Sequence, residues 1–301
     1  MARVRCFLTN YIGGGYYFNN NVTRDIEMKL VNSIDEYTRL LDECLEKSGV
    51  IYNHMLLPQH AAKSIREKHL YYETYGDSRV FFCDEKDFYK LYCFLMPDEV
   101  CNITSNDKPQ IIERIYKDNK DKENKNNLHL QIINLGFSEY TVNLRVKAIF
   151  DNNNTFDISN AQVKEGVFWE HPNHEDIKDI YKIWESLDKY DSIIPRNEEM
   201  HRLVNDKELI TLKIDNKVCA VAKIKEENRK TGSTWLVAVD ENYRNQGLAT
   251  LLYKVCFSFM REKGYKQAIQ WCDRTNTPIL NTIKKLGFDF DGTISKEYIL
   301  F

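Results

Sequence analysis

The sequence predicts an α/β fold with a mixed (α+β) sheet in two domains, and three observations support that prediction. The chain has 301 residues, and about 150 residues is a common size for one domain. Strand-like and helix-like segments alternate through the second half, as they do in sheets covered by helices. The polar run at 151–154 follows a strand-like segment and is the best linker candidate. We therefore expect one domain over residues 1–160 and another over residues 161–301.

Composition places the chain among ordinary globular proteins. Hydrophobic residues make up 43%, and 42 basic against 45 acidic residues give a net charge of −3, which argues against a general nucleic-acid binder. No apolar stretch reaches the length of a membrane span, and the N-terminus lacks the apolar core of a secretory signal. The eight cysteines form no C-x-x-C pair and fit reduced thiols, so we expect a cytoplasmic protein without a metal site. From the charge balance and the lack of an apolar span we expect no nucleic-acid or membrane partner. High Asn, Lys and Ile usage suggests a bacterial source.

The first half contains elements of both kinds. Apolar residues at helical spacing over 25–47 predict one or two amphipathic helices. Segments 80–83 and 91–96 predict two strands of a hairpin or meander. The ten polar residues 118–127 cannot bury apolar surface and predict a mobile loop. A long alternating strand is expected over 140–150, after a Leu-Gly-Phe phrase.

The second half follows a regular pattern of strands and helices. Helices are expected over 175–187, 246–263 and 277–286, and the last of these begins at Thr277 as its cap and ends before Gly287. The expected strands are 167–170, 208–214, 217–225, 235–239, 266–272, 288–291 and 298–301.

The segment between the predicted strand 235–239 and the long helix is a candidate anion site. It contains Arg244, Gly247 and Ala249 in an R-x-x-G-x-A pattern. A helix start offers unpaired backbone N–H groups and a partial positive charge, which suit a diphosphate. Gly247 has no Cβ, so an anion can approach its backbone, and Thr250 adds a hydroxyl group. The pattern is short, and its position between a strand and a helix makes it more specific.

This segment resembles the signature of the GCN5-related N-acetyltransferase (GNAT) superfamily. The resemblance covers residues 163–301 and rests first on the run from Val239 to Ala249. A second phrase, with Asn276 before a short helix and Gly287-Phe288 after it, is similar to the family's asparagine-initiated helix that ends in Gly-Phe. The resemblance implies the acyl-CoA N-acyltransferase (GNAT) fold for residues 161–301. It also implies acetyl-CoA, or another acyl-CoA, as the co-substrate.

The resemblance further implies how the co-substrate is held. In the family the pantetheine arm lies between two parallel strands that separate, here 235–239 and 266–272, and pairs with backbone groups as an added strand would. The matching backbone groups here are those of Val237 and Val239, and Asn276 matches a side chain that commonly touches the cofactor. The diphosphate would be held by Arg244, Asn245, Gln246, Gly247, Leu248, Ala249 and Thr250.

The family reaction is a direct attack of a neutral amine on the thioester through a tetrahedral intermediate. A backbone N–H near Val237 or Val239 would stabilise the oxyanion. Many members place a tyrosine in the short helix to protonate the leaving thiolate, whereas the matching position here is Ile283. The substitutes that remain open are Tyr298, Cys272 and a bound water.

The base that takes the amine proton is also open. Asp273 follows one of the separating strands, where acceptor sites of the family open, and Glu170 and His171 lie near the first strand–helix turn. Relay of the proton through water is the alternative. Trp235 and Trp271 lie on the two separating strands, and we expect them to pack in the core rather than to line the acceptor site.

The first half is expected to be a degenerate second copy of the same fold. Its Leu-Gly-Phe phrase at 135–137 and the strand that follows look like the end of the second half. No R-x-x-G-x-A pattern occurs before residue 160, so this copy would not bind CoA and would cover the acceptor site. Tandem members with one working half are known in the superfamily. An unrelated α+β domain is the alternative.

Three functions follow as expectations. The first is an N-acetyltransferase that acts on the amine of a small molecule. The alternatives are an acetyltransferase for a peptide or protein amine, and a CoA-binding protein that has lost catalysis. The sequence identifies neither the amine, nor the length of the acyl chain, nor the oligomeric state.

Overall fold

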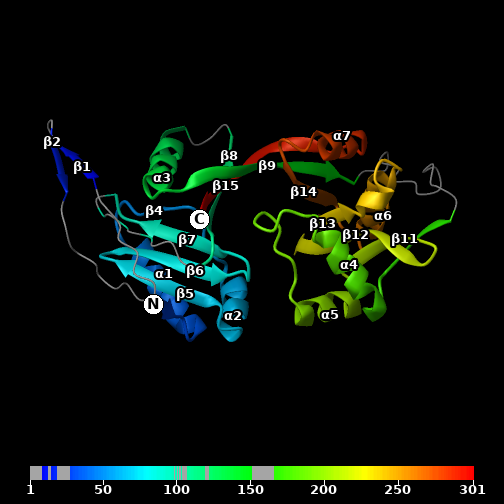
Figure 1. Ribbon diagram of the computed structural model, residues 1–301, viewed down its shortest axis with the longest axis horizontal. Coiled ribbons are helices and arrows are strands. Elements are labelled where there is room, and N and C mark those ends of the chain that lie inside the picture. Colours follow the sequence, from blue (N-terminus) through cyan, green and yellow to red (C-terminus); the bar gives the residue numbers. More distant parts are fainter. Residues whose placement is uncertain are drawn as a thin grey trace.

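The computed structural model describes residues 9–12, 15–18, 28–97, 99, 101, 103, 107–118, 122–150 and 166–301. We call residues 9–150 the N-terminal half and residues 166–301 the C-terminal half. Besides a separate two-stranded hairpin, one sheet of 13 strands runs through both halves (Figure 1). The predicted linker at 151–154 and the boundary near residue 160 lie outside the described residues, so the division into two domains stays a prediction.

The N-terminal half forms a mostly antiparallel run of strands with one parallel pair, and helices lie on both faces. Its elements are β1 (Thr9–Ile12), β2 (Gly15–Phe18), β3 (Lys29–Leu30), α1 (Ile34–Leu45), β4 (Ile51–Tyr52), α2 (Pro58–Arg66), β5 (Leu70–Tyr75), β6 (Ser78–Asp84), β7 (Tyr89–Leu95), β8 (Gln110–Lys117), α3 (Lys122–Asn134) and β9 (Ser138–Ile149). The expected strands at 80–83 and 91–96 are confirmed, because β6 and β7 pair antiparallel over them.

Helices α1 and α3 bear on two expectations for this half. The helix predicted within 25–47 is α1, which begins where Ser33 Oγ accepts a hydrogen bond from Glu36 N at 3.1 Å. The mobile loop predicted over 118–127 is wrong for its second part, because α3 begins at Lys122. The reason lies further along the helix, where Leu128 and Ile132 are buried against the sheet and anchor it.

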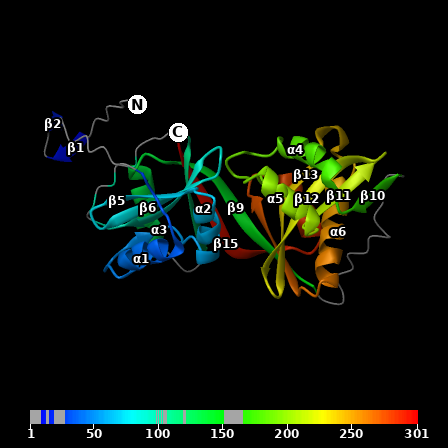
Figure 2. The same ribbon diagram turned by 90° about the horizontal axis from the view of Figure 1, so that it is seen from below.

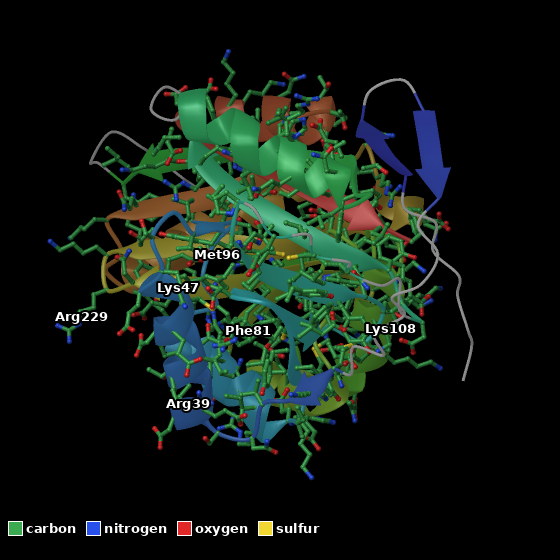
Figure 3. All side chains as sticks on the ribbon, turned by 90° about the vertical axis from the view of Figure 1, so that its left-hand side faces the viewer. Arg39, Lys47, Phe81, Met96, Lys108 and Arg229 are labelled. Atoms are coloured by element: carbon green, nitrogen blue, oxygen red, sulfur yellow. The ribbon has the colours of Figure 1, made fainter. Side chains whose placement is uncertain are left out.

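The core under α1 and α2 shows how this half is held together. Tyr37 of α1 and Ala61 of α2 pack against Phe81 of β6, and all three are almost wholly buried. Figure 3 shows this half from its outer side, with Phe81 among the strands and Arg39 at the surface of α1. Burial of this apolar surface stabilises the helices on the sheet.

The C-terminal half carries the remaining elements. They are β10 (Val167–Glu170), a short 3-10 turn η1 (His174–Asp176), α4 (Ile177–Trp184), α5 (Asn197–Asn205), β11 (Leu209–Ile214), β12 (Lys217–Asn228), β13 (Thr231–Val239), η2 (Glu241–Tyr243), α6 (Leu248–Glu262), β14 (Gln267–Asp273), α7 (Thr277–Lys285) and β15 (Asp289–Leu300). Helix α5 has no counterpart among the predicted elements.

The end of the chain differs from the expectation. The two closing strands predicted at 288–291 and 298–301 are one strand, β15. Its register against β9 shifts between Phe290 and Thr293, and Gly292 in that interval has a φ of 82°. A glycine bulge therefore keeps one strand continuous where the sequence suggested a turn. Asn276, rather than the predicted Thr277, caps α7, because its Oδ1 accepts from Ile279 N at 3.3 Å.

The two halves exchange their last strands. β9, which ends the N-terminal half, pairs antiparallel with β14 of the C-terminal half. β15, which ends the chain, pairs antiparallel with β8 of the N-terminal half. β9 and β15 also pair with each other, and Figure 2 shows both strands running between the halves. The halves are therefore joined through the sheet and not only through the chain that links them.

Helices cover both faces of this sheet. In Figure 1, α3 and α7 lie above it and α1, α2 and α5 lie below it. Helix α6 packs on buried residues of β14 such as Ala268 and Cys272, whereas α4 and α5 pack on Val221 and Ala238 of the opposite face. We call the face that carries α1, α2, α4 and α5 the lower face. Across it, Lys63 Nζ of α2 lies 2.7 Å from Glu199 Oε2 of α5. Among the described residues, no helix is long and apolar enough to cross a membrane.

Candidate active site

The candidate active site begins where β13 and β14 separate. The two strands are parallel, and they pair over only three residues, from Thr231 opposite Gln267 to Ser233 opposite Ile269. One step further, Thr234 Oγ1 donates a hydrogen bond to Gln270 Oε1. Beyond that point the register records no pairing between the strands. The separation of these two strands is what the sequence resemblance implied.

A bulge in β13 lies beside this separation. The register of β13 against β12 shifts between the Val221 and Lys223 pairs, and Leu236 adopts a φ of 51°. A left-handed conformation is unfavourable for a leucine, so the surroundings must hold it. The buried Trp184 of α4 does so, because its Nε1 donates to Leu236 O at 2.7 Å. The bulge therefore fixes the peptide groups near Val237, where the resemblance places the pantetheine arm.

The start of α6 is open to an anion. Gly247 precedes the helix with a φ of 78°, and no side chain caps the first N–H groups of α6. A Cβ placed on Gly247 would meet no atom within 4 Å, so the space over the turn is empty of protein. Asn245 also has a positive φ, of 60°. Uncapped N–H groups at the start of a 15-residue helix suit a diphosphate.

The other predicted cofactor residues surround this turn in different ways. Arg244 Nε donates to Val239 O at 3.3 Å, which ties the arginine to the end of β13. The Leu248 side chain is buried, so only its backbone can reach a ligand, while Ala249 and Thr250 are half-buried in the first turn of α6. Gln246 directly precedes Gly247, before the helix begins. The side-chain oxygen of Asn276 caps α7. Contact between Asn276 and a cofactor therefore stays a prediction.

Helix α7 does not supply a general acid for the leaving thiolate at the expected position. Ile283 occupies the position of the family tyrosine and is buried in the core with α6. Cys272 is buried on the same face of the sheet, and burial raises the pKa of its thiol to about 12. Both residues therefore serve packing, and a thiol with so high a pKa is a weak proton donor near neutral pH.

Tyr298 does not lie at the site. It belongs to the part of β15 that pairs with β8 of the N-terminal half, opposite Ile112, and it is fully buried. Its hydroxyl group makes a 3.0 Å hydrogen bond with His129 Nδ1 of α3. The strand exchange carries β15 away from β13, so the expectation that Tyr298 could protonate a leaving thiolate there is corrected to a packing role.

Glu170 is likewise separated from the site. It ends β10, and its Oε1 lies 2.5 Å from Lys213 Nζ, which also contacts Asp176 Oδ1 at 2.7 Å. β10 is three strands away from β13, or about 14 Å at the usual strand spacing. His171 next to it packs against Phe259 of α6. Glu170 is therefore part of an ion-pair cluster at the sheet edge.

Asp273 is the predicted base that the fold places at the site. It ends β14 directly across from Asn143 of β9. Because Cys272 faces α6, Asp273 and Trp271 face the lower face. Oδ1 of Asp273 accepts hydrogen bonds from the backbone N and the Oγ1 of Thr275, both at 2.8 Å. Its role as base stays a prediction.

The two tryptophans on the separating strands do not pack in the core as expected. Trp235 is 37% exposed, and its Nε1 donates to Ser233 Oγ at 2.8 Å. Trp271 is half-buried, with the Arg145 guanidinium 5.7 Å from its ring centroid. Both residues lie on the lower face, on either side of the separated strand ends.

The N-terminal half has a matching fork that the chain itself fills. β7 and β8 are parallel and pair only from Tyr89 to Leu91. Asn53 sits just beyond, where its Nδ2 donates to Leu91 O at 3.0 Å and to Glu113 O at 2.8 Å. Its Oδ1 accepts from Cys93 N at 2.8 Å. One side-chain amide thus bridges both strands, and sequence reasoning missed it because a lone asparagine after a short strand carries no signal.

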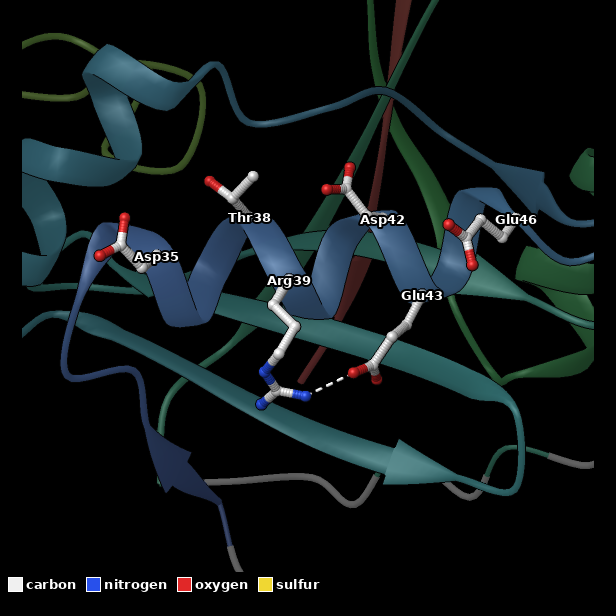
Figure 4. Close-up of a pocket in the computed structure, with 6 residues that line it drawn as sticks. All are labelled: Asp35, Thr38, Arg39, Asp42, Glu43 and Glu46. Atoms are coloured by element: carbon white, nitrogen blue, oxygen red, sulfur yellow. Dashed lines mark hydrogen bonds and ion pairs between the residues drawn. The ribbon is translucent and has the colours of Figure 1, made fainter.

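A surface hollow along α1 is lined by polar residues only (Figure 4). Arg39 and Glu43, one turn apart, form an ion pair there, and Glu43 Oε2 also lies 2.6 Å from Arg79 Nη2. Small-molecule sites are mostly apolar with a few polar groups, and this hollow has the character of a solvated helix face. We assign it no function.

Comparison with known proteins agrees with this geometry. Residues 170–288 match the model of the acetyltransferase (GNAT) family. A search of curated proteins gave no match. A GCN5-related N-acetyltransferase from Sphaerobacter thermophilus superimposes with a TM-score of 0.56 at 11% identity, covering 93% of this chain and 96% of that one.

Two further solved structures share the fold. A tandem GNAT protein from the clavulanic acid biosynthesis pathway has a TM-score of 0.55 at 10% identity, over 92% of this chain and 98% of that one. A GCN5-related glucosamine N-acetyltransferase region of a fungal multi-domain β-N-acetylglucosaminidase has a TM-score of 0.61 at 10% identity, over 93% of this chain and 39% of that one. At these identities the likeness shows the fold, which is that of tandem GNAT proteins over nearly the whole chain. Residues 170–288 form a domain of the acetyltransferase (GNAT) family, with the uncapped start of α6 and the separated strands β13 and β14 inside it.

Proposed function

We propose that the protein is an N-acetyltransferase that moves an acetyl group from acetyl-CoA to the amine of a small molecule. The observation that carries the proposal is the fork of β13 and β14 beside the uncapped start of α6. An extended arm with amide groups can add to the free edge of a strand, and its diphosphate can reach the helix start. The family match over residues 170–288 supports the same assignment.

The residues present fit the parts of this co-substrate. Arg244 and the backbone N–H groups from Gly247 to Thr250 would hold the diphosphate, since the space over Gly247 is open. Backbone groups of Val237 and Val239 would pair with the pantetheine amides. When bound, acetyl-CoA supplies an acetyl group activated as a thioester.

The protein's own groups then have three tasks. The bulge held by Trp184 would present backbone N–H groups of β13 to the reacting carbonyl, where a developing negative charge needs donors. Asp273, directly or through water, takes the proton of the attacking amine. No side chain of α7 replaces the family tyrosine at Ile283, and the thiolate leaves without that help because it is a stable anion near neutral pH.

The N-terminal half favours a small acceptor over a protein chain. On the lower face Lys63 of α2 contacts Glu199 of α5, and Tyr140 of β9 donates a hydrogen bond to Asp188 after α4. These bridges connect the two halves over the face on which Asp273 lies. A peptide acceptor would need that face to be open along its length.

Titration with acetyl-CoA tests the proposal. We expect the full chain to bind one acetyl-CoA with micromolar affinity in a calorimeter and to release CoA in the presence of amines. Absence of binding at high micromolar concentration would reject CoA chemistry altogether. Binding without CoA release on any amine of a broad panel would favour the alternative, a CoA-binding protein that has lost catalysis. The buried Ile283 at the position of the family tyrosine is consistent with that alternative.

A further inference from the structure

Two carboxyl groups meet on the lower face, at the junction of the halves. Glu297 lies on β15 between its neighbours Glu113 of β8 and Thr141 of β9, and only 7% of its surface is exposed. Asp191 comes from the segment between α4 and α5, and its carboxyl group faces that of Glu297. We call Asp191 and Glu297 the acid pair.

The acid pair is short of hydrogen-bond donors. Asp191 Oδ1 accepts one hydrogen bond, from Asn143 Nδ2 at 2.9 Å. Oε2 of Glu297 is buried, and apart from the carboxyl group of Asp191 no described residue offers it a hydrogen bond. Two ionised carboxylates cannot donate to each other, so a proton or a cation has to lie between them. Burial raises the pKa of both carboxyl groups. The charges of Asp191 and Glu113 raise the pKa of Glu297 further, against the opposing effect of Lys90. The hydrogen bond with Glu297 acts the other way on Asp191 and lowers its pKa.

The basic groups nearby do not balance these charges. Lys90 Nζ lies 2.5 Å from Glu113 Oε2 and therefore compensates that carboxylate. Burial lowers the pKa of His54, which leaves its ring neutral at pH 7. Asp188 and Asp273 add further negative charge next to Asp191. When both members ionise, the acid pair keeps its two negative charges.

The acid pair is connected to the candidate active site. Asn143, which donates to Asp191, lies directly across from Asp273 at the end of β14. Trp235 and Trp271 lie on the same face beside the separated strand ends. β15 is two strands away from β14, so Glu297 lies about 10 Å to the side of β14. One small molecule can span that distance.

We propose that the acid pair binds an ammonium group, and that the acceptor is therefore a diamine with its two nitrogens about 10 Å apart. One amine stays charged on Asp191 and Glu297, while the other reaches the separated ends of β13 and β14 in its neutral form and attacks. Aromatic rings beside the path, here Trp235 and Trp271, also favour a cationic guest. This inference rests on the proposed function, because it assigns the acceptor of that site.

Binding of three acceptors of one length tests the inference without relying on turnover. The probes are 1,8-diaminooctane, octylamine and 8-aminooctanoate, titrated into the full chain with saturating CoA at constant ionic strength. We expect the diamine to bind about tenfold more tightly than octylamine, and 8-aminooctanoate to bind least, because an acid repels the acid pair. In the Glu297→Gln variant the diamine should lose about tenfold in affinity. Glu139→Gln, an exposed acid of β9 whose Oε2 lies 2.6 Å from Lys296, is the matched control and should change nothing.

The outcomes separate the inference from the proposed function. Equal affinity for diamine and octylamine, or an unchanged diamine affinity in both Glu297→Gln and Asp191→Asn, overturns the inference even when acetyl transfer is observed. Loss of CoA release with every amine, together with tight diamine binding that depends on Glu297, supports the inference and rejects the transferase. Calorimetric binding of acetyl-CoA to each variant checks that the fold is intact, and Asp191→Asn serves where Glu297→Gln fails to fold.

Discussion

The two halves present the same fork of parallel strands, and they differ in what occupies it. In the N-terminal half β7 and β8 separate after three pairs, and Asn53 bridges the opening with one side-chain amide. The preceding strand β4 also pairs with β7, with Tyr52 opposite Phe94. In the C-terminal half no other described strand pairs with β13 beyond Ser233 on the side of β14. The difference teaches that a short added segment, and not the architecture, decides whether the strand edges of such a fork stay free.

The first prediction has the largest expected effect and concerns the start of α6, where the diphosphate is proposed to bind beside the fork of β13 and β14. Gly247→Asp would place a carboxylate where the diphosphate should lie, and we expect acetyl-CoA binding to weaken about a hundredfold, or about 2.7 kcal/mol. Gly264→Asp is the matched control, because Gly264 also has a positive φ, of 87°, and open space around it. Calorimetry on both variants makes the comparison. Equal losses at the two glycines would mean that strain, and not the ligand site, explains the result.

The second prediction breaks the filled fork. Asn53→Ala removes the hydrogen bonds of Asn53 to Leu91 O, Glu113 O and Cys93 N, and only Glu113 O keeps another contact, with His54 Nδ1 at 3.1 Å. We expect a loss of about 2–3 kcal/mol in the free energy of unfolding. Chemical denaturation measures that loss. The acetyl-CoA affinity should stay unchanged, with one molecule bound per chain.

Asn32→Ala provides the control for this variant. Asn32 is an exposed asparagine whose Nδ2 donates to Leu30 O at 3.0 Å, and its removal should cost far less. A second acetyl-CoA bound by Asn53→Ala would show that Asn53 alone had kept the N-terminal fork closed to the ligand.

The third prediction sharpens what holds the open fork in shape. Trp184→Phe keeps a ring in the core but removes the Nε1 donor to Leu236 O, so the strained bulge can relax. We expect acetyl-CoA affinity to fall about tenfold, with about 1–2 kcal/mol lost from the free energy of unfolding. Trp169→Phe, at a tryptophan that is 42% exposed on β10, is the control. An unchanged affinity would show that the bulge needs no support from α4.

Local patterns predicted much of the C-terminal half. The strand–turn–helix around Gly247 follows from alternation, a positive-φ glycine and helical spacing, all of which act over a few residues. The strand exchange could not be predicted this way, because β9 and β15 look alike as alternating strands and nothing local selects their partners. Tyr298 was misplaced for that reason, since β15 belongs to the other half's sheet. Asp191 and Glu297 were missed because they meet only after the exchange brings distant segments together.

The last and smallest expected effect compares the acid pair with the compensated pair beside it. Burial raises the pKa of Glu297 well above its usual 4.5, whereas Lys90 holds the pKa of Glu113 down at about 2 despite burial. The pKa of Glu297 is higher in the folded than in the unfolded protein, so its protonated form stabilises the fold below pH 4.5. This contribution is lost as the pH rises through the pKa of the folded state. Glu297→Gln should therefore match the wild type near pH 4 and exceed it by about 1–2 kcal/mol near pH 8, where its new amide donates to Asp191.

Thermal unfolding across pH 4 to 9 checks this difference, with Glu139→Gln as the control. The same variant is expected to lose diamine affinity, so the chain would keep a destabilising carboxylate because the ligand site requires it. A variant less stable than the wild type at pH 8 would mean that Glu297 is compensated in the folded protein. Glu297 would then be compensated as Glu113 is, and the argument that the acid pair binds a cation would fail.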